Sequence, residues 1–137
     1  MNTLHIGFIG TQSDLSSDKE RQVRLRNFLS GARTGYTDYV FHHGDGIGMD
    51  SVAHGIASSL GYKIHIHPPN VDTKRAYCTQ YNTIAYPKTY MDRNLDIAKT
   101  SHILIAMPKN PNEEEIRSGT WSTVRRARKV GTLVLFI

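Results

Sequence analysis

The sequence is poor in several features that mark specialised classes of protein. Its 137 residues include one cysteine, one tryptophan and five prolines. The single thiol, Cys78, excludes an internal disulfide and a cysteine-rich zinc site, and this low cysteine use favours a reducing compartment. No stretch approaches about 18 consecutive apolar residues, which excludes a hydrophobic membrane-spanning helix. The first residues lack the basic and apolar regions of a secretory signal, so we expect a cytoplasmic protein.

The composition that remains is typical of one globular domain, residues 1–137. Hydrophobic residues make up 39% of the chain and charged residues 21%, which is ordinary for a globular protein. The chain has 17 Lys and Arg against 12 Asp and Glu, for a formal charge of +5. This excess is consistent with a nucleic-acid partner, with an anionic small molecule, or with solubility alone.

Short apolar runs alternate with amphipathic helical patterns along the whole chain. The clearest helical pattern covers residues 49–60, where apolar residues recur at spacings of three and four until Gly61. Apolar runs typical of buried strands cover residues 6–9, 39–42, 62–66, 102–106 and 133–137. A stretch at about 70–88 has little periodicity and reads as a long loop. The pattern predicts an α/β, Rossmann-like three-layer domain with a parallel sheet of about five strands.

Polar residues at the predicted helix starts are typical N-caps. Ser17 and Glu20 form an S-x-x-E capping box before the first helix. Thr89 precedes the third helical pattern, and either Ser118 or Thr120 opens the last one.

Glycines and hydroxyl residues collect at the expected carboxyl ends of the strands, where ligands bind in sheets of this type. Two of these segments, residues 44–48 and 118–120, lead directly into helices. Backbone N–H groups and a helix N-terminus together suit a phosphate. The alternative for each segment is an ordinary tight turn or helix cap. We expect two phosphate cradles that face each other across the point where strand order reverses.

These segments supply the candidate ligand-binding residues. Backbone and hydroxyl groups would hold phosphate at five positions, namely Gly44, Gly46, Gly48, Gly119 and Thr120. Gly10 and Thr11 would line the floor of the site. Asp45 would contact a ribose hydroxyl or a base, whereas Asp50 serves either the ligand or only the helix dipole.

Three motifs resemble the SLOG superfamily of Rossmann-like proteins over nearly the whole chain. Residues 43–54, H-G-D-G-I-G-M-D-S-V-A-H, resemble the segment S-G-G-A-x-G-I-D-x-x-A-H of its DprA-like members. Arg93 and Asn94 resemble an Arg-Asn pair of the same members. Residues 118–125, S-G-T-W-S-T-V-R, are similar to the YpsA-like form G-T-W-x-T-x-R. The related LOG enzymes are phosphoribohydrolases.

The resemblance implies a protein that binds a nucleotide or a nucleotide-derived ligand such as ADP-ribose, as a sensor or carrier. Arg93 would pair with a phosphate, and no further cofactor is expected. The matching segments add three candidate ligand-binding residues, Asn94, Ser118 and Thr123, and the strand-end segment 108–120 adds Pro108. A homodimer or higher oligomer is also implied by the resemblance alone.

The first alternative is an enzyme, a phosphoribohydrolase that cleaves the N-glycosidic bond of nucleoside monophosphates. LOG enzymes carry M-x-x-R-K, of which this chain keeps the Met and the Arg, with Asn94 in place of Lys. Thr123 stands where their catalytic Glu is expected. A carboxylate is needed to stabilise positive charge on the ribose. Arg93 and Glu115, from the loop carboxylates 113–115, are therefore the candidate catalytic residues.

The second alternative is single-stranded DNA binding of the DprA type. The basic end of the last predicted helix, residues 125–129, favours it, although cations there also suit the helix dipole. Tyrosines in and after the long loop, at 77, 81, 86 and 90, either stack bases or pin the loop to the sheet. Nucleic acid is possible but not favoured.

The seven histidines do not predict a metal site, because only His65 and His67 have a recognisable ligand spacing.

Overall fold

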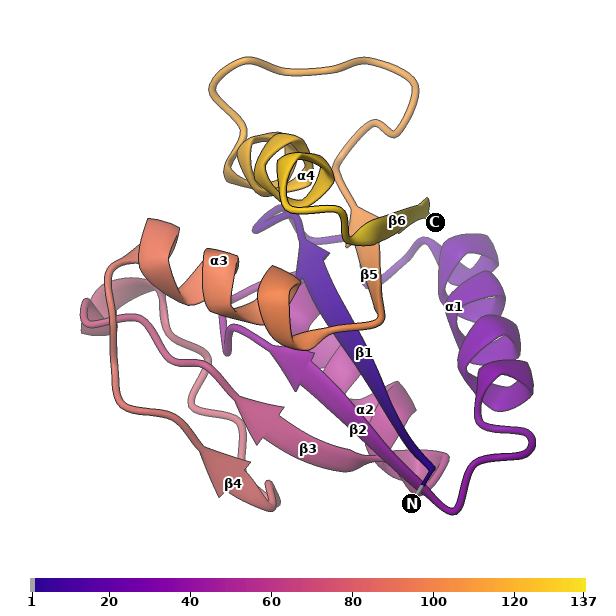
Figure 1. The fold of residues 1–137 in the computed structure, drawn as a ribbon. Coiled ribbons are helices and arrows are strands. Elements are labelled where there is room, and N and C mark those ends of the chain that lie inside the picture. Colours follow the sequence, from indigo (N-terminus) through magenta and orange to yellow (C-terminus); the bar gives the residue numbers. More distant parts are fainter. Residues whose placement is uncertain (1) are drawn as a thin grey trace.

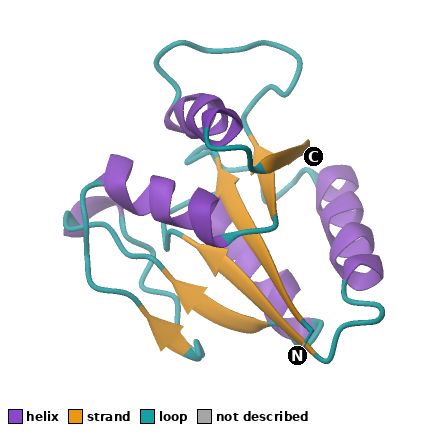
Figure 2. Cartoon of the chain, viewed as in Figure 1, coloured by secondary structure: helices purple, strands orange, loops and turns teal. Residues whose placement is uncertain are grey.

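The computed structural model describes residues 2–137, whose strands and helices alternate along the chain (Figures 1 and 2). The strands are β1 (Thr3–Gly10), β2 (Asp38–His43), β3 (Lys63–Ile66), β4 (Thr83–Ile84), β5 (Ile103–Met107) and β6 (Leu133–Phe136). The α-helices are α1 (Lys19–Ala32), α2 (Met49–Ser59), α3 (Tyr90–Thr100) and α4 (Gly119–Lys129), and a short 3-10 helix covers Asp72–Lys74.

All neighbouring strands pair in parallel, in the order β4-β3-β2-β1-β5-β6. The predicted three-layer α/β fold is confirmed, but the sheet has six strands rather than about five. The additional strand, β4, is two exposed residues that extend the edge beside β3. A two-residue strand is too short to show alternation, so the sequence pattern did not indicate it. Strand order reverses between β1 and β5.

The helices cover the two faces of the sheet in pairs. In Figure 1, α3 lies in front of the sheet and α2 behind it. Leu25 and Leu29 of α1 and Met49 of α2 pack in one buried cluster with Phe41 of β2. The other buried cluster joins α3 and α4 to β5, with Trp121 and Val124 on α4 at its outer side. The two clusters hold the carboxyl ends of β1 and β5 together at the reversal.

The helix starts agree with the sequence in two cases of three. Thr89 caps α3 and Ser118 caps α4, each through its side-chain oxygen. The first helix begins one residue later than the capping box predicts, because the carboxylate of Asp18, not the hydroxyl of Ser17, accepts from the Arg21 amide. Within residues 2–137, every helix is too short or too polar to span a bilayer.

Candidate functional site

A cavity of about 680 Å³ opens at the carboxyl edge of the sheet, where strand order reverses. It lies among the ends of β1 and β5, the start of α2, the start of α3 and the start of α4. Ten candidate residues line it, namely Gly10, Thr11, Gly46, Asp50, Arg93, Asn94, Glu115, Ser118, Gly119 and Thr120. The fold therefore brings most of the expected residues to one place.

Five candidate residues lie outside the lining, namely Gly44, Asp45, Gly48, Pro108 and Thr123. The carbonyl of Pro108 accepts a hydrogen bond of 2.7 Å from the buried guanidinium of Arg21, which holds the loop after β5. The hydroxyl of Thr123 donates to the carbonyl of Gly119, one helical turn earlier. Both residues lie behind the residues that line the cavity and do not line it themselves.

Amides of the glycine-rich turn between β2 and α2 donate hydrogen bonds to other groups of the protein. The Asp45 amide donates to His43 and the Gly46 amide to Asp50, both at 2.9 Å. The amides of Ile47 and Met49 donate to backbone carbonyls. The amides of Asp45, Gly46, Ile47 and Met49 therefore already have partners, which argues against a phosphate cradle built from this turn.

Two glycines of this turn have strict packing requirements instead. A Cβ at Gly48, whose φ is +87°, would lie 2.7 Å from the carbonyl oxygens of Thr11 and Gln12. A Cβ at Gly44 would clash with the guanidinium of Arg93. The turn needs glycine so that β1 and Arg93 can approach it closely.

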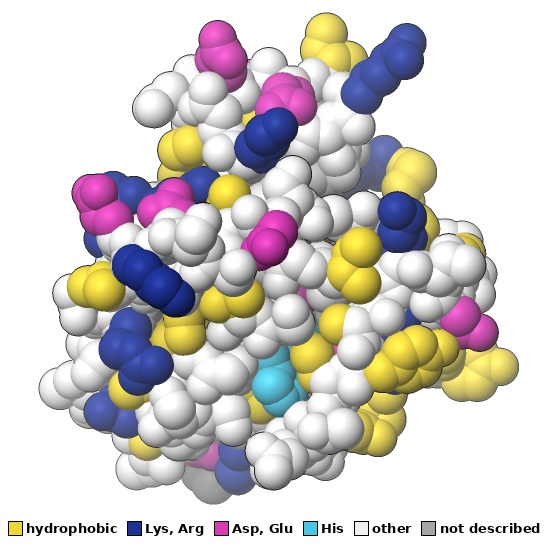
Figure 3. All heavy atoms as spheres, turned by 180° about the vertical axis from the view of Figure 1, so that it is seen from behind, with side chains coloured by type: hydrophobic (Ala, Val, Ile, Leu, Met, Phe, Trp, Pro, Cys, Tyr) yellow, Lys and Arg dark blue, Asp and Glu magenta, His cyan; other side chains and the backbone are white. Residues whose placement is uncertain are grey.

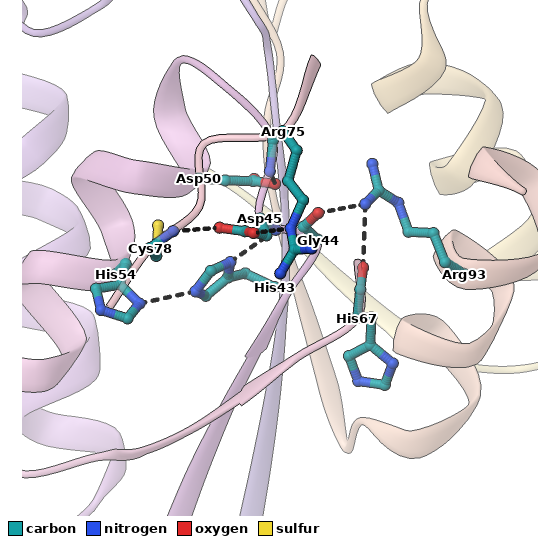
Figure 4. A network of polar contacts seen from close by, with 10 residues as sticks. His43, Gly44, Asp45, Asp50, His54, His67, Arg75, Cys78 and Arg93 are labelled. Carbon is teal, nitrogen blue, oxygen red and sulfur yellow. Dashed lines mark hydrogen bonds and ion pairs between the residues drawn. The ribbon is translucent and has the colours of Figure 1, made fainter. Parts of the chain in front are cut away.

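Asp45 is fully buried and anchors the loop that follows β3 (Figure 4). Its carboxylate accepts from Arg75 Nε at 2.6 Å and from the Cys78 amide at 2.8 Å. Burial by itself would raise the pKa of Asp45, but these hydrogen bonds outweigh it and hold the pKa below its ordinary value. The expected contact with a ribose or base is therefore not available to this side chain.

The same anchor includes two histidines in a closed hydrogen-bond chain. His43 Nδ1 accepts from the Asp45 amide, and His43 Nε2 lies 2.9 Å from His54 Nδ1. His54 Nε2 lies 2.8 Å from the carbonyl of Thr79. One proton on each Nε2 satisfies every ring nitrogen. Burial raises the pKa of the nearby Cys78 thiol to about 12, so it is not a reactive nucleophile.

Asp50, on the first turn of α2, lies in the cavity wall with only 4% of its surface exposed. One carboxylate oxygen accepts from the Gly46 amide, whereas the other, Oδ1, is buried without a partner among residues 2–137. Burial raises the pKa of Asp50 to about 6, against the opposing influence of Arg93. A buried acceptor of this kind is costly unless something else binds it.

Arg93 forms part of the cavity wall beside the β2–α2 turn, and only 6% of its surface is exposed. Its Nη1 donates to the carbonyls of Gly44 and His67, and its Nε to the side chain of Asn94. No residue in the described part of the chain accepts from Nη2. The hydroxyl of Tyr90, another lining residue, is also buried without a partner there. The cavity wall thus holds unpaired donors beside the unpaired acceptor of Asp50.

The N-terminus of α4 presents open amides to the cavity. The Ser118 hydroxyl accepts from the Trp121 amide, but within residues 2–137 the amides of Gly119 and Thr120 have no partner. Of the two expected cradles, this one keeps the N–H groups that an anion needs.

Two lysines that were not among the candidate residues add positive charge to the cavity. Lys74 and Lys109 line it, and together with Arg93 they outnumber its carboxylates, Asp50 and Glu115. Five other lining residues were not among the candidate site residues, namely Ile9, Gln12, Ser13, Ile47 and Tyr90. Gln12, Ser13 and Ile47 lie in strand-end segments where the sequence predicts the ligand, at residues 10–13 and 43–48, but they were not named as candidates. Lys74 gave no signal, because it lies in the aperiodic stretch.

Histidines from neighbouring strands meet on the face of the sheet opposite His43. His42 Nδ1 lies 3.0 Å from His67 Nε2, and the His65 and His67 ring centroids are 4.5 Å apart. Burial lowers the pKa of His42 to about 3 and that of His67 to about 4, so both rings are neutral at pH 7. Pairing of β2 with β3 adds His42 to the two histidines already linked by their spacing.

The fold is shared with known proteins. No protein-family profile and no curated protein matches the sequence. The structure is similar to the molybdenum cofactor binding protein from the phototrophic bacterium Rippkaea orientalis, with a TM-score of 0.72 and 19% identity over 99% of this chain and 77% of that one. It is also similar to a Moco carrier protein from Chlamydomonas reinhardtii, with a TM-score of 0.67 and 19% identity over 98% and 76% of the two chains. These structural similarities, at 19% sequence identity, establish the Rossmann-like fold of this chain and nothing about its ligand.

Proposed function

We propose that this chain binds a nucleotide or a nucleotide-derived, phosphate-bearing small molecule in the cavity at the strand-order reversal, as a sensor or carrier. The observation that carries the proposal is the buried, unpartnered Oδ1 of Asp50 in the same wall as Arg93. A ligand hydroxyl or amine that donates to this oxygen removes the cost of leaving it unpaired.

The opposite end of the ligand is the phosphate, which binds at the start of α4. The open amides of Gly119 and Thr120 and the Nη2 of Arg93 are donors for its oxygens. Lys74 and Lys109 at the cavity add positive charge that attracts an anion. The volume of about 680 Å³ lies within the range of small-molecule and cofactor sites.

The structural neighbours favour a second candidate ligand. Two proteins of the same fold, which cover nearly all of this chain, are named for binding or carrying the molybdenum cofactor. Carrying without chemistry agrees with Thr123, which has no carboxylate where the LOG enzymes have their catalytic one. The molybdenum cofactor therefore belongs in any ligand panel beside the nucleotides.

Calorimetric titration with nucleoside mono- and diphosphates, ADP-ribose and the molybdenum cofactor tests the proposal. Substitutions at Gly119 test the role of a single amide. Gly119 is the first residue of α4, where proline is tolerated, and Ser118 before it is extended. Gly119→Pro removes one open amide without breaking the helix, whereas Gly119→Ala keeps the amide and meets no neighbouring atom.

We expect micromolar or tighter binding of one phosphate-bearing ligand to the wild type and to Gly119→Ala. Gly119→Pro is expected to bind it about tenfold more weakly, because one hydrogen bond to a charged group is lost. The absence of binding at millimolar concentrations, or equal affinities of the Pro and Ala variants, would overturn the proposal.

Hydrolysis of the nucleotide is the alternative that the position of Glu115 favours, since it lines the cavity with Arg93. Chromatography of the protein incubated with each nucleoside monophosphate detects the free base. Release of base that Glu115→Gln abolishes would replace the carrier function by a phosphoribohydrolase. No base above background leaves binding as the function.

Single-stranded DNA binding has less support in the charge distribution. Arg125, the one residue of the basic stretch 125–129 that matches a motif of the superfamily, pairs with Glu114 at 2.7 Å. On the face shown in Figure 3, basic side chains are interspersed with acidic and hydrophobic ones. We expect no gel retardation of single strands at low salt; strong, salt-sensitive retardation would favour the DNA-binding alternative.

A further inference from the structure

Three histidines form a cluster outside the cavity, on the sheet face opposite the Asp45 anchor. One ring nitrogen from each of His42, His65 and His67 lies within 4.8 Å of the others. His42 and His67 are buried, whereas His65 is half-buried. In Figure 4 the His67 ring points away from Arg93, which contacts only the carbonyl of that residue. The cluster is therefore separate from the machinery proposed for ligand binding.

The spacing of the cluster suits a tetrahedral metal ion. Zinc binds imidazole nitrogens at about 2.0–2.1 Å, so two nitrogens on one ion lie about 3.3 Å apart. His42 Nδ1 and His67 Nε2 are 3.0 Å apart, within a few tenths of an ångström of that separation. Both residues are on paired parallel strands or directly after one, so the sheet holds them in register.

Neighbouring side chains orient two of the three rings for this role. His42 Nε2 lies 2.8 Å from His5 Nδ1, so a proton on Nε2 leaves the lone pair of Nδ1 for a metal. His65 Nδ1 hydrogen-bonds the hydroxyl of Thr83 on β4, which leaves its Nε2. Metal-binding histidines characteristically donate their other N–H in this way.

The contrast with the other histidine cluster is informative. His43, His54 and Cys78 also bring ligand atoms together, but their ring nitrogens are fully used by a chain that ends on backbone groups. In the His42 cluster, both nitrogens of His42 are hydrogen-bonded, to His5 and to His67, but no described residue forms a hydrogen bond with His65 Nε2.

We propose that His42, His65 and His67 bind a divalent transition-metal ion, with zinc the ion that their chemistry favours first. Three neutral imidazoles suit zinc, copper and nickel but not magnesium or calcium, which prefer oxygen ligands. Three protein ligands leave one tetrahedral position for water or an exogenous ligand. The half-buried side of His65 is where that position meets solvent.

Zinc titration of untagged protein against a chromogenic chelator tests this site. We expect one zinc ion per chain with micromolar or tighter affinity, and a rise in melting temperature on zinc addition. His65→Ala is expected to weaken zinc at least about tenfold, whereas His54→Gln, in the other cluster, is expected to bind zinc like the wild type. Circular dichroism without metal checks that both variants fold.

X-ray absorption of the zinc-loaded protein gives an independent readout, because a shell with three imidazole ligands is expected. Four outcomes would overturn the proposal: no zinc binding at micromolar concentrations, unchanged affinity in His65→Ala, loss of binding in His54→Gln, or sulfur in the first shell. None of these measurements depends on the ligand of the cavity.

Discussion

Two buried aspartates, five residues apart, have opposite environments, Asp45 in the turn after β2 and Asp50 on the first turn of α2. Asp45 is completely buried, and its carboxylate accepts from Arg75 and from the Cys78 amide. Asp50 is 4% exposed, accepts from the Gly46 amide, and keeps Oδ1 unpaired in the cavity wall. The pKa of Asp45 lies below its ordinary value, whereas burial raises that of Asp50 to about 6.

The difference shows that hydrogen-bond partners, not residue type or burial, distinguish a structural carboxylate from one available to a ligand. Asp45 stabilises the loop after β3 because each of its oxygens has a donor. Asp50 destabilises the free protein because its buried Oδ1 has no donor, and a bound ligand that donates to this oxygen would remove the destabilisation. Substitutions at the two positions are therefore expected to change stability in opposite directions.

The largest effect is expected for Asp45→Ala. The substitution leaves the Arg75 guanidinium and the Cys78 amide without their buried acceptor. Removing one partner of a buried ion pair costs about 3 kcal/mol or more. Urea denaturation measures this loss, with Asp38→Ala, which removes an exposed ion pair with Lys63, as the control expected to change stability little. A loss below about 1 kcal/mol for Asp45→Ala would contradict the claim that Asp45 stabilises the loop after β3.

Asp50→Asn is expected to stabilise the ligand-free protein at pH 8. Because the folded pKa of about 6 exceeds the unfolded value of 3.8, the wild type loses stability as pH rises between these values. At pH 8 the cost is about 3 kcal/mol, which Asn avoids. Melting curves from pH 4 to 8 measure the difference, which is expected to vanish near pH 4. A variant less stable than the wild type at pH 8 would contradict the assignment.

The same contrast holds on a smaller scale for the starts of α2 and α4. The amides of Gly46, Ile47 and Met49, in the turn before α2 and at its first residue, are used internally, whereas those of Gly119 and Thr120 at the start of α4 are open. Ser118→Ala removes only the cap that accepts from Trp121, at a cost of about 1 kcal/mol. Thermal melts are expected to show this loss while the stabilisation by added ligand persists. Disappearance of the ligand effect would mean that the hydroxyl, not the amides, binds the phosphate.

The sequence predicted those parts of the molecule that depend on local patterns. Helical spacing located α2, and Thr89 and Ser118 marked the starts of α3 and α4. The parallel sheet and its ligand-binding edge followed from the alternation of elements. Most of the candidate residues line the cavity for the same reason.

Features that depend on contacts between distant segments were not predictable in this way. Asp45 and Asp50 look alike in sequence. What makes their environments differ is that Arg75 and Cys78 donate hydrogen bonds to Asp45, and both of these residues lie in an aperiodic loop. The amides of residues 44–48 find partners that only the folded turn provides. His42 joins His65 and His67 through strand pairing, which residue spacing does not encode.

A crystal structure of the protein with the nucleotide that binds most tightly would show whether the ligand occupies the cavity between Asp50 and the start of α4. We expect the phosphate at the amides of Gly119 and Thr120 beside Arg93, with a hydroxyl or amine of the ligand donating to Asp50 Oδ1. A phosphate bound instead at residues 44–48, or a nucleotide outside the cavity with Asp50 still unpaired, would contradict this expectation.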